Sequence, residues 1–183
     1  MEKKELKILT VNKKNEEKFL RQKTADFDFS KFSKKEVNKL TQNMRKVMIA
    51  ADGIGLAANQ IGLDFRLFVA QISKTDRHDN PRSLSPGEYK FYAIFNPEII
   101  KKSSEKSTID EGCLSVPGGY FGEVERPEKI TLVGYDKNGK KIKIKAWGLL
   151  ARVFQHEVDH LNGTLYIDKA KNLKKIETEK NSK

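Results

Sequence analysis

The chain has 183 residues, of which 37% are hydrophobic and 33% are charged, and its formal net charge is +11. This length favours one domain with a sizeable core, and the composition is typical of a soluble globular protein. No apolar run approaches the ~18 residues that a membrane span needs. The start, "MEKKELKILT", resembles neither a secretory signal nor a transit peptide. We therefore expect a cytoplasmic protein with no membrane partner.

The cysteine content and the net charge further limit the kinds of protein that this sequence can encode. The single cysteine, Cys113, excludes an internal disulfide and leaves a free thiol. The positive charge fits either a solvated lysine-rich surface or attraction to an anionic partner such as ribosomal RNA. The sequence has no recognisable nucleic-acid-binding motif, and its aromatic residues are not interleaved with the basic ones. We therefore expect no direct DNA binding.

The first half of the chain predicts a helix, a tight loop and a strand. Residues 1–32 are weakly patterned, with a possible short strand at Leu6–Val11. "SKKE", from Ser33 to Glu36, fits a helix capping box, and the apolar residues behind it recur at steps of three and four. They predict an amphipathic helix over Val37–Ala51. "GIGLAANQIG", from Gly53 to Gly62, then indicates a tight loop, and residues 65–72 read as a strand.

The middle of the chain predicts an insertion, a strand and a hairpin. Residues 73–90, which include His78, are polar and indicate an exposed insertion. "FYAIFNPEII", residues 91–100, predicts a strand broken by Pro97. "KITLVGYD" and "KKIKIKAW" flank Asn138-Gly139, which is a strong hairpin turn signal. Lysines alternate with apolar residues in the second of these strands, so one of its faces should be solvated.

The last part of the chain predicts a helix that carries two histidines. "WGLLARVFQHEVDHLNG", residues 147–163, has an apolar helical stripe and ends at a glycine that favours helix termination. His156 and His160 are four residues apart, so their rings project from one face and both reach a single metal ion. Glu157 is rotated by about 100° from His156, where it can accept a proton from a metal-bound water. The alternative is a structural pair of histidines, but an apolar helix buries such polar groups only for a purpose.

Three candidates compete for the third metal ligand. An extended zincin pattern requires a histidine where this chain has Tyr166. A thermolysin-type site requires a downstream glutamate, and Glu177 and Glu179 lie in a loose tail. Cys113, in "DEGCLSVPGGY", has small neighbours and offers a thiolate, which is a strong ligand for a borderline metal. The chemistry therefore favours Cys113.

Three segments together resemble the peptide deformylase family. They are "GIGLAANQ" (Gly53–Gln60), "EGCLS" (Glu111–Ser115) and "QHEVDH" (Gln155–His160), and the resemblance covers about residues 40–168. It implies hydrolysis of the formyl group of N-formylmethionyl peptides, which releases formate. It also implies one divalent metal ion, usually Fe(II), with zinc, nickel or cobalt as possible occupants.

The resemblance assigns roles to individual residues. It implies that Cys113, His156 and His160 bind the metal, that Glu157 transfers the proton, and that Gln60 and the Leu114 backbone N–H stabilise the oxyanion. It also implies an extended substrate beside Ile54–Gly55 and Glu111–Gly112. The candidates for the wall of the methionine pocket are Ile54, Ile109, Leu114 and Val153. Glu111 and Asp159 are expected to support the site, with Arg126 or Arg152 as a partner.

The resemblance also has departures. Many family members carry a proline after an "ILT"-like strand, and this chain has none there. Tyr120 stands where many bacterial members place an arginine that contacts the substrate backbone. Some members dock on the ribosome through a basic carboxy-terminal helix, and residues 169–183 here are basic. Ribosome binding near the nascent-chain exit is therefore a possible partnership.

These observations combine into one expected architecture. We expect an α+β fold in which antiparallel sheets wrap a central helix carrying the HExxH motif, with the amphipathic N-terminal helix packed outside. Residues 1–168 should form a single catalytic domain, and residues 169–183 a basic tail or short helix. Two other functions remain open: an HExxH metallopeptidase that cuts internal peptide bonds, and a ribosome-associated basic protein with a structural metal.

Overall fold

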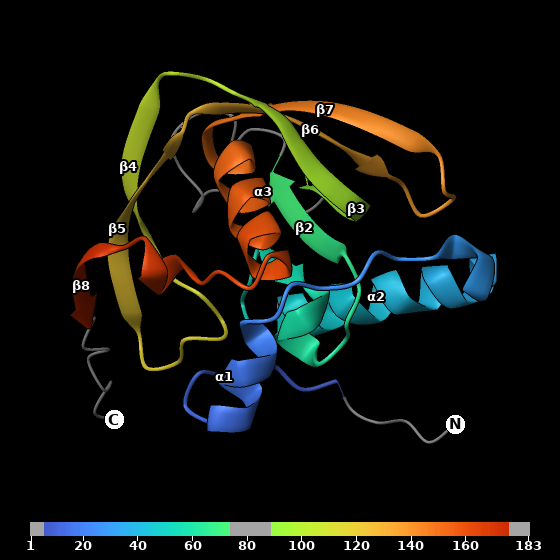
Figure 1. Ribbon diagram of the computed structural model, residues 1–183, viewed down its shortest axis with the longest axis horizontal. Helices are drawn as coiled ribbons and strands as arrows, with labels where there is room; N and C mark the ends of the chain where they lie inside the picture. Colours follow the sequence, from blue (N-terminus) through green and yellow to red (C-terminus); the bar gives the residue numbers. More distant parts are fainter. Residues whose placement is uncertain (1–5, 74–88, 176–183) are drawn as a thin grey trace.

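The computed structural model describes residues 6–73 and 89–175 of the chain as a mixed α/β structure (Figure 1). Within these ranges, no helix is both long enough and apolar enough to cross a membrane. The α-helices are α1 (Lys14–Leu20), α2 (Lys34–Ala50) and α3 (Gly148–Leu161), and the short 3₁₀ helices are η1 (Phe29–Lys31), η2 (Ala58–Ile61) and η3 (Tyr166–Asp168). The strands are β1 (Gly55–Ala57), β2 (Leu67–Ser73), β3 (Tyr89–Lys102), β4 (Lys106–Glu111), β5 (Tyr120–Pro127), β6 (Lys129–Tyr135), β7 (Lys141–Trp147) and β8 (Lys171–Lys175).

The strands form two antiparallel sheets. The larger sheet has the order β1-β2-β3-β6-β7, and the smaller has the order β4-β5-β8. Every pair of neighbouring strands in both sheets is antiparallel. The predicted mixed fold with antiparallel sheets is therefore confirmed. The predicted hairpin is present as β6 and β7, which pair from Lys129 opposite Trp147 to Tyr135 opposite Lys141.

Helix α3 lies in the middle of the molecule, between β2 and the strands β4 and β5 (Figure 1). Most of its residues are buried, and its apolar side chains share one core with the inner faces of β2, β3, β6 and β7. Burial on nearly all sides, including that of Arg152, Gln155, Glu157 and His160, places this helix in the interior of the molecule. The polar residues on this helix are therefore held in a rigid, largely dry environment.

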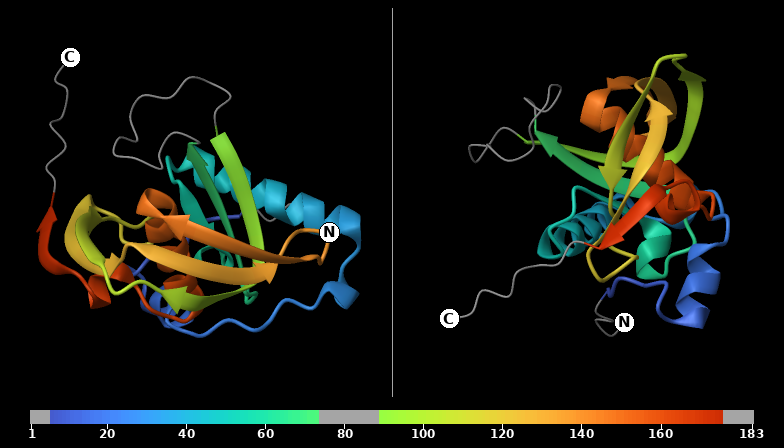
Figure 2. Two further views of the ribbon diagram at one scale, coloured as in Figure 1. Left: turned by 90° about the horizontal axis from the view of Figure 1, so that it is seen from above. Right: turned by 90° about the vertical axis from the view of Figure 1, so that its left-hand side faces the viewer.

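Helix α2 packs on the other face of the larger sheet. Side chains alternate between the two faces of a strand, and β2 follows this rule. Phe68 and Ala70 belong to the core around α3, whereas Leu67 and Val69 belong to a second core beneath α2. The right view of Figure 2 shows α3 and α2 on opposite sides of β2.

The ends of both long helices are fixed by side chains. The predicted capping box at α2 is present: Glu36 N donates to Ser33 Oγ (3.3 Å), and Ser33 N donates to Glu36 Oε2 (2.8 Å). At the end of α3, Asn59 Nδ2 donates to the His160 carbonyl oxygen (2.6 Å). Gly163 follows with a φ of 75°, and a Cβ atom there would overlap the backbone of Arg21. Only glycine therefore fits at the predicted end of this helix.

Several predicted elements differ from the structure. Residues 6–11 form no strand; Leu9 N donates instead to the Gln60 carbonyl oxygen (2.7 Å), so the segment binds η2. Helix α1 was not predicted. Pro97 does not break β3, because a shift of register between Phe95 and Glu98 accommodates it. Residues 74–88, most of the predicted insertion, lie outside the described residues.

The carboxy-terminal prediction is also wrong in part. Residues 171–175 are neither a loose tail nor a short helix, but form strand β8. Tyr120 of β5 pairs with Lys175 of β8, and Phe121 pairs with Lys174. Residues 176–183 lie outside the described part of the chain. The described end of the chain is therefore part of the smaller sheet.

Candidate metal and active site

One cysteine from a distant segment meets the two histidines of α3. Cys113 follows β4, and its Sγ lies 3.1 Å from His160 Nε2. His160 Nε2 lies 3.2 Å from His156 Nε2, which is one helical turn away. All three candidate ligand atoms lie within 4.8 Å of one another. The structure thus brings together the three residues that the sequence assigned to the metal.

The geometry of these atoms fits a divalent ion. Zinc binds thiolate sulfur at roughly 2.3 Å and imidazole nitrogen at roughly 2.0–2.1 Å, with tetrahedral angles. Such angles separate two ligand atoms by roughly 3.3–3.6 Å, close to the separations in this structure. Three protein ligands also match a catalytic site, which keeps a fourth position for water or substrate. The Cys113, His156 and His160 side chains are therefore suited to hold one ion.

The charges at these residues support metal binding. Burial raises the pKa of the Cys113 thiol, but the neighbouring His160 and His156 outweigh burial and hold that pKa well below its usual value. Burial lowers the pKa of His156, but hydrogen bonds with Cys113 and Glu111 raise it to about 10. In this pair, a thiolate faces a protonated imidazole, and a metal ion would take the place of the proton between them. Metal binding should therefore release protons.

Glu157 lies next to this cluster without belonging to it. Its side chain is 3% exposed, and Oε2 has no hydrogen-bond partner among the described residues. Burial raises the pKa of Glu157 to about 7, although the positive charges of His156 and His160 oppose this shift. A buried carboxylate with a pKa near neutrality is suited to accept and return a proton.

Gly55 of β1 leaves the room that Glu157 occupies. A Cβ atom on Gly55 would overlap Glu157 Oε1 and would lie 2.8 Å from Glu157 Cδ. The backbone of the predicted substrate-binding loop therefore passes directly against the carboxylate. This contact explains the glycine after Ile54 in "GIGLAANQ", because any larger residue would displace the carboxylate.

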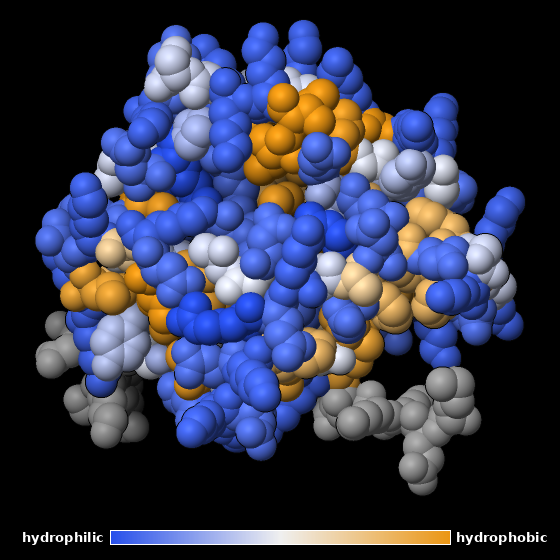
Figure 3. Space-filling view, viewed as in Figure 1, coloured by the Kyte–Doolittle hydropathy of each residue, from blue (hydrophilic) through white to orange (hydrophobic). Residues whose placement is uncertain are grey.

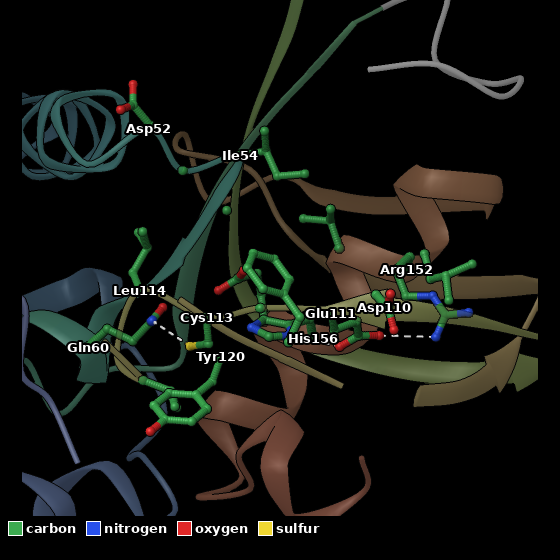
Figure 4. A pocket seen from close by; sticks show the side chains of 18 of the residues that line it. Asp52, Ile54, Gln60, Asp110, Glu111, Cys113, Leu114, Tyr120, Arg152 and His156 are labelled. Carbon is green, nitrogen blue, oxygen red and sulfur yellow. Dashed lines mark hydrogen bonds and ion pairs between the residues drawn. The ribbon is translucent and has the colours of Figure 1, made fainter. Parts of the chain in front are cut away.

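Gln60 places its amide group beside the cysteine. Its Oε1 accepts a hydrogen bond from Ala57 N (2.9 Å), which fixes the orientation of the amide. Its Nε2 then donates to Ser115 Oγ (3.1 Å) and lies 3.6 Å from Cys113 Sγ. Figure 4 shows Gln60 and Cys113 pointing toward one another, with Leu114 beside them. The amide hydrogens are therefore held at the edge of the metal cluster.

Glu111 fixes one of the two histidines. Its Oε2 lies 2.9 Å from His156 Nδ1, so a proton on Nδ1 leaves Nε2 free to bind a metal. Arg126 binds both carboxylate oxygens, at 2.6 Å and 2.9 Å, and Arg152 Nη1 donates to Oε1 at 3.0 Å. Burial raises the pKa of Glu111, but the bonds with Arg126 and His156 keep it well below its usual range.

Both arginines named from the sequence are therefore partners of Glu111. Arg126 also binds Asp159 Oδ2 at 2.6 Å, and Lys169 binds the same oxygen at 2.5 Å. The sequence predicted one pairing and left its identity open. It did not indicate Lys169, because nothing in the spacing places residue 169 beside α3.

A cavity of about 480 Å³ opens beside the metal cluster. Every residue predicted to bind substrate lines it, and these are Ile54, Gly55, Ile109, Glu111, Gly112, Leu114 and Val153. Phe121 was not predicted, although its ring lies against Gly112, where a Cβ atom would be 2.8 Å from the ring. Tyr120 lines the cavity as well and is 42% exposed (Figure 4). The competing ligands Glu177 and Glu179 lie outside the described residues.

Comparison with known proteins decides the family. A family model described as polypeptide deformylase matches residues 6–176. The chain belongs to the peptide deformylase family. Peptide deformylases are metal-dependent enzymes that remove the N-formyl group from nascent peptides. The peptide deformylase of Rhizobium meliloti (strain 1021) is 41% identical over 140 residues, which are 76% of this chain and 74% of that protein.

Solved peptide deformylases have a similar fold. A probable peptide deformylase from synechococcus phage S-SSM7 has a TM-score of 0.75 and 41% identity, and the match covers 90% of this chain and 99% of that one. The class I type b peptide deformylase of Acinetobacter baumannii, in a structure bound to Met-Ala-Ser, has a TM-score of 0.76 and 30% identity. That match covers 90% of this chain and 97% of the Acinetobacter chain.

Proposed function

We propose that Cys113, His156 and His160 bind one divalent ion, and that this centre removes the formyl group from N-terminal formylmethionine and releases formate. One observation carries the proposal. The three ligand atoms lie within 4.8 Å of one another beside a buried glutamate oxygen that has no hydrogen-bond partner among the described residues, at the side of a cavity of about 480 Å³. A merely structural site would have no use for that carboxylate or that cavity.

We assign each step of the reaction to a residue. The bound ion supplies Lewis-acid chemistry, which lowers the pKa of a water molecule and polarises the formyl carbonyl. Glu157 accepts the proton of the attacking water and later delivers it to the nitrogen of the leaving amine. The Gln60 amide and the Leu114 backbone N–H donate to the oxygen that becomes negative in the transition state. Glu111 keeps the His156 ring in the orientation that binding requires.

The substrate is an extended peptide that begins with formylmethionine. Its backbone lies between Ile54–Gly55 and Glu111–Gly112, and its methionine side chain enters the cavity among Ile109, Leu114 and Val153. Gly55 and Gly112 flank this route, and the absence of their Cβ atoms leaves room for the Glu157 carboxylate and the Phe121 ring, which line the same cavity. The Met-Ala-Ser peptide in the Acinetobacter structure supports a site for a chain that begins with methionine.

The native ion and the cellular setting complete the proposal. A thiolate and two imidazoles suit several divalent metals, and Fe(II) is the ion that the family resemblance favours over zinc, nickel and cobalt. We place the enzyme in the cytoplasm, acting on newly made chains. Residues 169–183 are the segment through which it would associate with the ribosome, since six of these residues are lysines and two are glutamates.

The decisive test is formate release from formyl-Met-Ala-Ser by protein purified without oxygen. We expect turnover by the metal-loaded chain and a rate lower by roughly 100- to 10,000-fold for Glu157→Gln, since general acid–base catalysis contributes this much. Metal content measured on both proteins separates lost chemistry from lost metal. Absence of formate from a folded, metal-loaded sample would refute the proposal. Cleavage of internal peptide bonds, with metal retained in Cys113→Ala, would support the metallopeptidase instead.

A further inference from the structure

A second groove lies on the outer face of the larger sheet. Its volume is about 370 Å³. The described residues that line it include four lysines and one tryptophan, with no acidic residue. Its charged and aromatic members are Lys101, Lys102, Lys129, Lys145 and Trp147. Nothing in the deformylase chemistry uses this groove.

The register of the strands explains why four of these five side chains share one face, whereas Lys102 lies opposite Ile130, which belongs to the core around α3. Lys101 of β3 lies opposite Thr131 of β6, which lies opposite Lys145 of β7. Lys129 of β6 lies opposite Trp147 of β7. The residues between them, such as Ala146, point to the other face and pack in the core around α3. The side chains of Lys101, Lys129 and Lys145 and the Trp147 indole therefore face away from the core around α3.

This half of the outer face is left open by the helices. The second core, which lies beneath α2, covers the same face over β1, β2, the first part of β3 and Tyr135 at the end of β6. In the left view of Figure 2, β6 and β7 lie nearest the viewer and cross in front of α3. Figure 3, in contrast, views the molecule from the side of α3, where apolar side chains gather over β3, β6 and β7 amid hydrophilic ones. The groove thus lies on a different face of the molecule from these apolar side chains.

The charge of the groove is not neutralised within the described residues. None of its four lysines forms an ion pair with a described side chain, whereas Lys106, at the next turn, pairs with Glu125 at 2.9 Å. Lys141 and Lys143 extend the same face along β7 and are exposed. Side chains two apart on a strand are separated by roughly 6.5–7 Å, so β7 presents a row of evenly spaced positive charges.

We propose that this groove binds single-stranded RNA. Proteins that hold single strands combine a basic groove, which follows the phosphates, with an aromatic side chain on which a base stacks. Lys101, Lys129 and Lys145 bind phosphates, and the Trp147 indole stacks on a base. The choice of RNA over DNA rests on the proposed function, because nascent formylated chains emerge from a particle built on RNA. Binding itself does not rest on deformylation, since no residue of the groove belongs to the metal site.

Trp147 makes the proposal directly measurable. It is the only tryptophan of the chain, so its fluorescence reports this groove alone. We expect a uridine oligomer of roughly 12 nucleotides, within the ~4–16 nucleotides that such grooves cover, to quench the fluorescence in a saturable way. A thymidine DNA oligomer should quench more weakly. Equal or tighter DNA binding would overturn the choice of RNA, and absence of saturable quenching at low salt would overturn the site.

The salt dependence of RNA affinity tests whether the lysines of the groove bind phosphates. Each phosphate contact with a single strand contributes about 0.7 to the slope of log Kobs against log salt. Changing Lys101, Lys129 and Lys145 together to glutamine should therefore make the slope less negative by about 2. Between ~50 and ~200 mM salt, the wild-type chain should then lose about 20-fold more of its affinity than the triple variant. An unchanged slope would overturn the assignment.

A matched variant separates this groove from charge in general. Lys34, Lys35 and Lys39 are exposed on α2, so changing these three to glutamine removes the same charge elsewhere. This control should keep the slope of the wild-type chain. An equal change in both triple variants would mean diffuse attraction and would overturn the proposal. Binding of phosphatidylserine vesicles but not of RNA would also overturn it.

Variants of Trp147 test stacking. Trp147→Phe keeps a ring before the first residue of α3 and should retain affinity, measured by anisotropy of labelled RNA. Trp147→Ala should weaken binding by about 5- to 150-fold, the range for loss of one stacked base. If Trp147→Ala does not fold, the salt dependence of the lysine variants still tests whether the groove binds RNA. Formate release by these lysine variants should match that of the wild-type chain, so a failure of deformylation and a failure of RNA binding remain distinguishable.

Discussion

Replacing Gly55 by alanine should displace the carboxylate that we assign to proton transfer. The new Cβ atom would overlap Glu157 Oε1, would lie 2.8 Å from Glu157 Cδ, and would lie 3.0 Å from Val153 Cγ1. Carbon atoms in favourable contact are about 3.5–4.0 Å apart, so the carboxylate must retreat by roughly 1 Å. The φ angle of Gly55 lies outside the left-handed region, so alanine adds crowding without backbone strain.

The expected cost follows from that displacement. A misplacement of about 1 Å at a reacting group lowers turnover by roughly 100-fold. We therefore expect kcat for formyl-Met-Ala-Ser to fall by about this factor. Metal content should stay at the wild-type level, because the ligands themselves are untouched. The assay is formate release at saturating peptide, with metal measured on the same samples.

A double-mutant cycle with Glu157→Asp isolates the contact. Aspartate is shorter by one methylene group and frees the space that the alanine methyl needs. Gly55→Ala should then cost far less in the aspartate background than in the wild-type chain. Equal losses in both backgrounds, or a wild-type kcat for Gly55→Ala, would refute our reading of Gly55 as the residue that makes room for Glu157.

Three further predictions test the site. Cys113→Ala should lower metal affinity by more than the ~10–100-fold typical of outer-shell changes; metal retention in dialysed protein would contradict this. Glu111→Gln should leave Arg126 and Arg152 with an uncompensated buried charge, and urea unfolding should show a loss of about 3–5 kcal/mol; a loss under 1 kcal/mol would be inconsistent with the network. In the metal-free protein, the pKa of Glu157 is raised from its ordinary 4.5 to about 7. The folded state therefore favours the protonated acid, and stability is lost as pH rises from 4.5 to 7. The free energy of unfolding of Glu157→Gln should thus exceed that of the wild-type chain by ~3 kcal/mol at pH 8, with no gain at pH 4. A gain in stability that grows as the pH falls would contradict a raised pKa of Glu157.

The sequence predicted the features that depend on local periodicity. His156 and His160 are placed together by the period of one helix, and Ser33 with Glu36 by the geometry of one turn. Asn138-Gly139 sets a hairpin through its own backbone preferences. In each case the residues that interact are within a few positions of one another, so spacing alone determines whether they meet.

Contacts between distant segments required either a family resemblance or the structure. Cys113 is 43 residues from His156, and no periodicity links them. The two arginines that bind Glu111 come from β5 and α3, so their joint pairing depends on how a strand and a helix pack. Chemistry alone predicted that a buried carboxylate needs a partner, but not that it would have three.

The edges of the fold were the least predictable. All five residues of β8 are exposed, so the strand has no apolar alternation to identify it. It forms because β5 offers an edge with which it pairs. Likewise, Leu9 N donates a hydrogen bond to a carbonyl oxygen of η2 and not to a strand. The aromatic and basic residues of the second groove are also separated in sequence, and three strands bring them together.

The coordination of the ion can be measured by X-ray absorption on the zinc-loaded protein. We predict one sulfur atom at about 2.3 Å and two imidazole nitrogens at about 2.0–2.1 Å from the metal, with the sulfur lost in Cys113→Ala. A first shell of nitrogen and oxygen alone in the wild-type chain would show that Cys113 does not bind the ion, and would contradict the mechanism built on it.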